Sequence, residues 1–67
     1  MDSDVLKGKW KQLRGEAKQQ WGELTNDDLD KAEGRRDKLV GVIQERYGYT
    51  KERAEREVDE FLAEYSR

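Results

Sequence analysis

The residues best suited to chemistry in this sequence are clustered carboxylates, in the segment NDDLD that follows Thr25. Carboxylate and amide oxygens bind hard cations, and a close pair of carboxylates can act as general acid and base. The segment lacks the loop length, the central glycine and the closing glutamate of an EF-hand. Acidic residues are also expected in the first turn of a helix. We therefore expect Thr25 and Asp28 to form a capping box at a helix start, and we expect no metal site.

The rest of the composition also argues against catalysis. The chain has no histidine and no cysteine, which removes the commonest general base, the thiol nucleophile and most transition-metal ligands. Hydrophobic residues make up 33% of the chain and charged residues 45%. The apolar residues are too few to enclose a cleft that would raise the pKa of a catalytic carboxyl group. We expect a protein that is not an enzyme and uses no cofactor and no small-molecule substrate.

Basic residues supply a second kind of candidate site, an interaction face. Basic side chains beside an aromatic residue, as in KGKWKQLRGEAK, can bind nucleic-acid phosphates, and a basic helix with tryptophans can lie on a membrane. Against both uses stand a pI of 5.2 and a spacing that places Trp10 and Trp21 on an apolar stripe, where burial is favoured. The candidate face comprises Lys7, Lys9, Lys11, Arg14, Lys18, Arg35, Arg36 and Lys38.

An internal repeat predicts the elements that hold these residues. The glycines at 8, 15 and 22 recur with the same spacing at 34, 41 and 48, and these are all the glycines of the chain. Each set is followed by a threonine, Thr25 or Thr50, and then by a charged helical pattern. A threonine hydroxyl caps a helix start well, and glycine is the usual left-handed residue after a helix end. The pattern predicts a duplicated helical hairpin, with Gly22 and Gly48 as left-handed helix stops.

Apolar spacing places the helices. Residues recur at steps of three or four along three stripes, as expected for helices with one buried face. The stripes are Leu6, Trp10, Leu13, Ala17, Trp21 and Leu24; Arg36, Leu39, Val40, Ile43 and Tyr47; and Ala54, Val58, Phe61, Leu62 and Tyr65. A short helix between the first two has only Leu29 and Ala32. The predicted helices run from about Asp4 to Trp21, Asn26 to Glu33, Arg35 to Tyr47 and Lys51 to Tyr65.

The predicted fold class is therefore all-α, with four short helices arranged as two packed helical hairpins in a compact orthogonal bundle. Residues 1–67 are expected to form a single domain, stabilised by packing alone. Gly15 and Gly41 fall inside helices, on faces opposite the apolar stripes, where each should cost helix stability relative to alanine.

Charge alternates along the chain with the same period as the repeat. Residues 5–21 carry a net charge of +4, residues 22–34 of −4, residues 35–53 of +3 and residues 54–67 of −3. The simplest explanation is attraction between neighbouring helices, together with solubility.

The segments KGKWKQLRGEAKQQWGELTNDDL and GRRDKLVGVIQERYGYTKERAEREV closely resemble the CsbD-like family of small bacterial proteins, and the match covers nearly the whole chain. Its most specific parts are GKWKQL, WGELTNDDL and QERYGYTKERAE. The resemblance implies a general stress-response protein, induced by osmotic or starvation stress and of undefined molecular activity. It also implies a compact all-α fold of two helical hairpins. The family has no established catalytic or binding residues, so the resemblance assigns none here.

These observations lead to a functional hypothesis. A mean hydropathy of −1.30 and glycines on exposed helical faces suggest a hydrophilic protectant that shields other macromolecules during water loss. The alternative is a small helical module that binds a protein partner or, less favoured, binds nucleic acid non-specifically through its basic first and third helices. We expect a soluble, cytoplasmic monomer, because no apolar run has the length of a membrane span and MDSDVLKGKW has no apolar signal segment.

Overall fold

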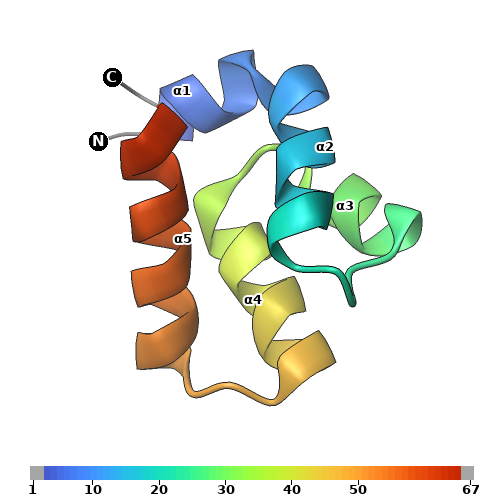
Figure 1. The fold of residues 1–67 in the computed structure, drawn as a ribbon, viewed down its shortest axis with the longest axis vertical. Coiled ribbons are helices and arrows are strands. Elements are labelled where there is room, and N and C mark those ends of the chain that lie inside the picture. Colours follow the sequence, from blue (N-terminus) through green and yellow to red (C-terminus); the bar gives the residue numbers. More distant parts are fainter. Residues whose placement is uncertain (1–2, 66–67) are drawn as a thin grey trace.

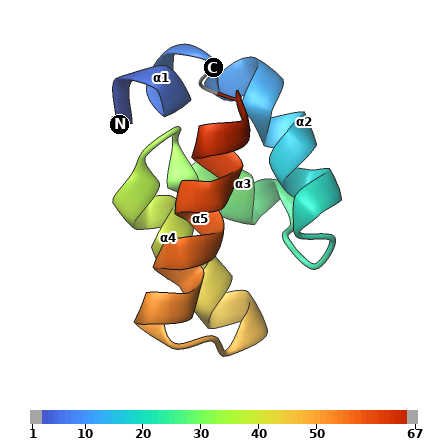
Figure 2. The ribbon, with the colours of Figure 1, turned by 60° about the vertical axis from the view of Figure 1, so that its left-hand side comes forward.

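The computed structural model describes residues 3–65 of the chain, and the side chains of residues 6–65. In this part the chain forms five helices and no strand, which confirms the all-α class. The helices are α1 (Ser3–Gly8), α2 (Trp10–Gln20), α3 (Asn26–Ala32), α4 (Arg36–Tyr47) and α5 (Lys51–Tyr65). α4 lies between α3 and α5, and α1 crosses the C-terminal end of α5 (Figure 1, Figure 2).

The prediction of one helix from Asp4 to Trp21 is wrong, because the chain bends at Lys9. Lys9 has φ −113° and ψ 17°, and its carbonyl accepts hydrogen bonds from the amides of Gln12 and Leu13 at the start of α2. We call residues 7–11 the elbow. The turn between α3 and α4 packs against it, since a Cβ atom built on Gly34 would lie 3.0 Å from atoms of both Lys7 and Trp10. The bend therefore turns α1 across the molecule. The backbone of Gly34 packs against the bend, where a larger residue would collide with Lys7 and Trp10.

The two loops that follow α2 and α4 end their helices differently. Gly48 is left-handed, with φ 71°, as predicted. Gly22 is not left-handed, so that prediction is wrong; Trp21 instead ends α2, with φ −122° and ψ 84°. The physical reason is loop length, because the first loop has one more residue between its glycine and its threonine than the second. The longer loop can reverse direction over several residues and does not need a left-handed glycine.

The buried apolar residues are those of the predicted stripes. Every aliphatic residue of the three stripes is buried, as are Leu29 and Ala32 of α3. Trp10, Tyr47 and Tyr65 pack against this core at its edge. Val42, which lies outside the predicted stripes, is also buried. One core therefore joins all five helices.

Aromatic contacts connect the end of α2 to α5. The ring of Trp21 lies 5.0 Å from that of Phe61, which lies 4.9 Å from that of Tyr65 (centroid distances). The indole N–H of Trp21 donates to Glu57, 2.9 Å away, and the hydroxyl of Tyr65 donates to Glu16, also 2.9 Å away. α2 and the Trp21 that follows it are therefore fixed against α5 by both apolar and polar contacts.

The two glycines inside helices are exposed, as predicted. Gly15 lies in α2 and Gly41 in α4, and a Cβ atom built on either would have no neighbouring atom within 4 Å. Neither glycine makes a close contact within the chain that would require the absence of a side chain.

Candidate functional site

The carboxylate cluster NDDLD forms the predicted capping box. The Asp28 amide donates to the hydroxyl of Thr25 at 3.1 Å, and the Thr25 amide donates to Oδ2 of Asp28 at 3.0 Å. These bonds satisfy amides at the start of α3 that have no partner inside the helix. The carboxylate at the centre of the candidate metal cluster therefore acts as a helix cap.

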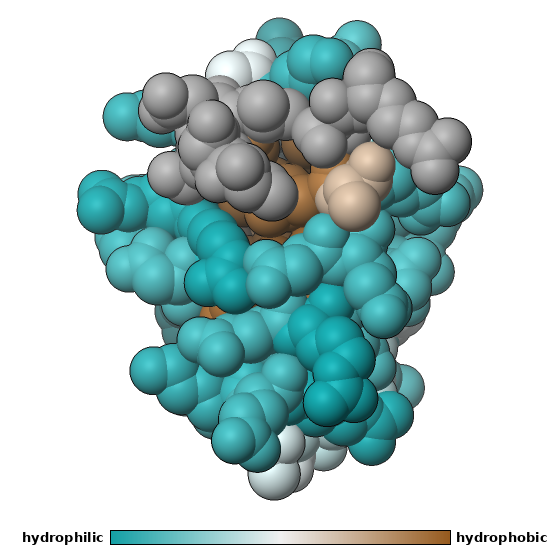
Figure 3. All heavy atoms as spheres, turned by 90° about the vertical axis from the view of Figure 1, so that its left-hand side faces the viewer, coloured by the Kyte–Doolittle hydropathy of each residue, from teal (hydrophilic) through white to brown (hydrophobic). Residues whose placement is uncertain are grey.

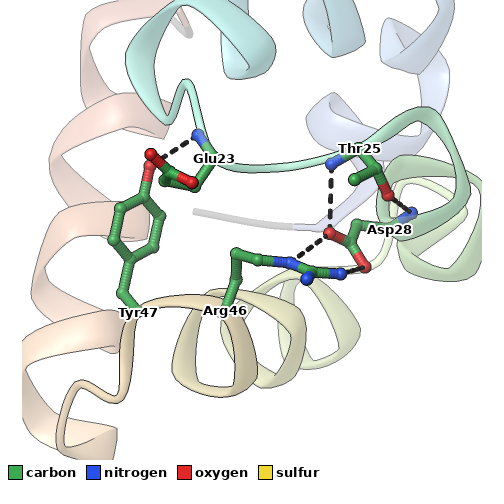
Figure 4. A network of polar contacts seen from close by, with 5 residues as sticks. All are labelled: Glu23, Thr25, Asp28, Arg46 and Tyr47. Atoms are coloured by element: carbon green, nitrogen blue, oxygen red, sulfur yellow. Dashed lines mark hydrogen bonds and ion pairs between the residues drawn. The ribbon is translucent and has the colours of Figure 1, made fainter.

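The Asp28 carboxylate has a second partner that no local pattern predicts. Arg46, near the end of α4, donates from Nε to Oδ2 at 2.9 Å and from an Nη atom to Oδ1 at 3.0 Å (Figure 4). The Asp28 side chain is 3% exposed, whereas that of Arg46 is 44% exposed. The hydrogen bonds from Arg46 lower the pKa of Asp28 to about 2 and outweigh the effect of burial. Asp28 is thus a buried carboxylate that is ionised at neutral pH.

Tyr47, the next residue of α4, holds the other end of the same loop. Its hydroxyl accepts a hydrogen bond of 3.0 Å from the amide of Glu23 (Figure 4). Figure 4 shows both α4 side chains reaching toward the loop between α2 and α3, one at each end of it. We call this set, Glu23, Thr25, Asp28, Arg46 and Tyr47, the loop clamp. Its polar atoms bind one another, and its geometry is that of a structural support.

Four of the eight residues of the predicted basic face, Arg14, Lys18, Arg36 and Lys38, make close polar contacts inside the molecule. Three residues bind acidic side chains of neighbouring elements at 2.7–2.9 Å: Arg14 with Asp30, Arg36 with Asp59, and Lys38 with Glu33. The Arg36 pair is bidentate and lowers the pKa of Asp59. Lys18 donates to the amide oxygen of Asn26 at 3.2 Å, and Arg35 lies 4.0 Å from Asp37. Attraction between oppositely charged segments, the simpler explanation of the charge pattern, accounts for the three ion pairs of Arg14, Arg36 and Lys38.

Lys7, Lys9 and Lys11 differ from the other members of the predicted face. All three are exposed and lie in the elbow. Among the side chains of residues 6–65, no acidic group lies within 4.0 Å of their ammonium groups. Gly34 contacts the elbow, and Arg35, which is 57% exposed, is the next residue along the chain. The structure thus brings the backbone before Arg35 against the segment that carries the three lysines, and the other four residues of the predicted face make polar contacts elsewhere.

The opposite charge gathers on the outer face of α5, which faces the viewer in Figure 3 and is mostly hydrophilic. A shallow groove runs along it, lined by Glu52, Glu55, Arg56, Asp59, Glu60 and Ala63. Within the described residues, no group of three or more acidic side chains has the geometry to hold a metal ion. None of the described helices is both long enough and apolar enough to span a bilayer.

The fold and these surfaces define a small all-helical protein, in which ion pairs tie charged helices together around one apolar core. Its sequence matches the family model described as CsbD-like over residues 4–56. The chain belongs to the CsbD-like family.

Similar proteins occur in several bacteria under the name UPF0337. The chain is 62% identical to a UPF0337 protein of Pseudomonas aeruginosa, over 91% of this chain and 94% of that protein. It is 61% identical to one from Bordetella pertussis, over 92% and 94% of the two chains. It is 59% identical to the UPF0337 protein YjbJ of Escherichia coli K12, over 87% and 84%. None of these names states a reaction, a ligand or a partner.

Proposed function

We propose that this protein is a non-enzymatic stress-response protein that protects other macromolecules when water is withdrawn, as in osmotic or starvation stress. The observation that supports the proposal is that apolar residues lie in the core and charged residues at the surface. The apolar residues of the three stripes are buried or packed at the core edge, which leaves a surface built largely from charged side chains. Such a surface binds water strongly and offers few apolar contacts to other proteins.

Several finer predictions belong to this proposal. Residues 1–67 act as one domain, built by duplication of a helical hairpin, and the protein works as a monomer in the cytoplasm without a cofactor. The shared glycine spacing and the matched positions of Lys9 and Arg35, each the N-cap of a helix, support the duplication.

Protection can be tested by freezing or drying a labile enzyme with and without the protein and measuring the activity recovered. We expect more recovery than with an equal mass of an inert globular protein. If the charged surface is responsible, the variant Glu52→Gln with Glu60→Gln, which alters two exposed residues of α5, should fold normally and protect less. Recovery equal to that given by the inert protein would refute the proposal.

The alternative, an adaptor that docks its first or third predicted helix on a protein partner, predicts a different result. Affinity capture from stressed cells should then recover one stoichiometric partner, whereas a protectant should recover none.

A further inference from the structure

The elbow carries three lysines that form no ion pair with the described side chains. Arg14, Arg36 and Lys38 bind acidic neighbours, whereas Lys7, Lys9 and Lys11 are exposed and have no acidic partner among residues 6–65. Unpaired exposed cations within one or two helical turns create a local positive potential even on a chain with a net charge of −2.

Packing adds a fourth cation from a distant segment. Gly34 approaches the elbow so closely that a Cβ atom would lie 3.0 Å from the Cα of Lys7. Arg35 follows directly, with its side chain 57% exposed. Two acidic groups lie near it: Asp37, 4.0 Å from Arg35, and Glu33, which already binds Lys38 at 2.8 Å. These two carboxylates reduce the positive potential near Arg35, but neither forms an ion pair with the three lysines.

We propose that Lys7, Lys9, Lys11 and Arg35 form a docking surface for the phosphodiester backbone of duplex nucleic acid. Regularly spaced phosphates are the partner that fits several exposed cations without a pocket, and such binding is independent of sequence. The acidic groove on α5 belongs to a different helix and repels the same partner, so binding is restricted to the elbow.

The surroundings of the elbow favour a duplex over two other anionic partners. An interfacial helix must insert apolar side chains into a membrane, but Leu6 and Leu13 are buried and Trp10 packs on the core. Single strands are bound largely by stacking on free aromatic rings. The partly buried aromatic rings, Trp10, Tyr47, Tyr49 and Tyr65, all pack against the core. Tyr47 and Tyr49 also stack on each other at the α4–α5 turn, at the far end of the molecule from the elbow (Figure 1), and the Tyr65 hydroxyl donates to Glu16.

The test is fluorescence anisotropy with a labelled DNA duplex of about 20 base pairs, titrated with the full chain at several salt concentrations. We expect a dissociation constant on the order of 10–100 μM at low salt, weakening steeply as salt rises. Contact with three or four phosphates gives a slope of about −3 in a plot of log K against log salt.

Two triple variants with the same change in net charge make the test specific. Lys7→Gln with Lys9→Gln and Lys11→Gln should weaken binding at least tenfold. Lys31→Gln with Lys51→Gln and Arg56→Gln alters exposed cations elsewhere and should change it less than twofold. Replacing the three elbow lysines by arginine keeps the charge and should keep the affinity, which separates a loss of charge from a loss of folding.

The proposal is overturned if the duplex does not bind at low salt, or if the two glutamine variants lose affinity equally. It is also overturned if vesicles of anionic phosphatidylglycerol bind and the duplex does not, or if the anisotropy change reflects only self-association of the protein in sedimentation experiments.

Discussion

The two copies of the repeat place equivalent residues at two helix junctions, and the junctions differ in packing. Lys9 occupies the N-cap position of α2 and Arg35 that of α4, each directly after a glycine and without a side-chain capping bond. Gly8 is exposed and ends α1, and a Cβ atom built on it would have no neighbouring atom within 4 Å. Gly34 is buried, left-handed with φ 73°, and touches the elbow. The duplicated sequence therefore repeats the break, but only one of the two glycines is required by its surroundings.

The loops after α2 and α4 also differ, in the contacts that hold each loop to the next helix. Thr25 caps α3 as part of a complete capping box with Asp28. Thr50 accepts a single bond, from the amide of Arg53. Arg53 occupies the position equivalent to Asp28 and places its guanidinium 3.8 Å from the centre of the Tyr49 ring. One loop is thus held by the ion pair between the buried Asp28 and the half-exposed Arg46, and the other by stacking and a single cap.

The largest expected difference between the copies is at the glycines before the helix caps. Gly34→Ala puts a side chain on a left-handed residue and against Lys7 and Trp10, so it should lower the free energy of unfolding by about 2 to 3 kcal/mol. Gly8→Ala has open space and should change it by about 1 kcal/mol or less, in the stabilising direction. Urea unfolding followed by circular dichroism measures both, and equal effects would contradict the unequal packing.

The next effect concerns the loop clamp and depends on pH. The pKa of Asp28 is lowered from 3.8 to about 2, so its ionised form stabilises the fold above about pH 4. That contribution, about 2 kcal/mol, is lost as the pH falls from about 4 to 2. Asp28→Asn should remove most of it at neutral pH and flatten the acid dependence of unfolding.

Asp27→Asn is the matched control for that experiment, because Asp27 is an exposed neighbour in the same first turn. It should leave the acid dependence nearly unchanged. A wild-type chain whose stability does not fall over the acid range in which Asp28 becomes protonated would show that the ion pair with Arg46 does not stabilise the fold.

A smaller effect distinguishes the two threonine caps. Thr50→Ala removes one bond to the start of α5 and should cost about 1 kcal/mol. Thr25→Ala also removes the hydroxyl that helps to position Asp28, and should cost somewhat more, up to about 2 kcal/mol. Thermal unfolding of the two variants in parallel gives the comparison, and the reverse order would argue against the capping box as the stronger cap.

The smallest effect concerns a feature that the two copies share, an exposed glycine inside a helix. Gly15→Ala and Gly41→Ala both add a methyl group in open space on a helix, so each should stabilise the fold by up to about 1 kcal/mol. Melting temperatures of the single and double variants should rise additively. A fall for either would show that glycine is needed there. Recovery of the labile enzyme should be measured on the same variants.

Much of the fold was predictable because its signals are local. The apolar stripes, the capping box at Thr25 and the left-handed Gly48 each depend on residues within a few positions of one another. The break at Lys9 was missed although the repeat contained a signal for it: Gly34 was already placed between two helices, and Gly8 is its equivalent. The bonds from Arg46 to Asp28 and from Tyr47 to Glu23 join distant segments, and no spacing rule predicts such pairs.

The candidate site was predictable to a lesser degree. The composition identified the basic residues, but their pairing depends on which helices become neighbours, and this is decided by packing. Arg36 finds Asp59 across the α4–α5 interface, whereas Lys9 lies on a bend that the apolar spacing did not predict.

The loop clamp also bears on how the chain reaches its structure during synthesis. The N-terminal half emerges from the ribosome first, with Asp28 and Glu23 already present and Arg46 and Tyr47 still to be added. Until those two residues emerge, neither the Asp28 carboxylate nor the Glu23 amide can form its bond to α4. The loop of the first copy can therefore form its full set of hydrogen bonds only after the second copy has been translated. Folding of the first half is thus coupled to synthesis of the second.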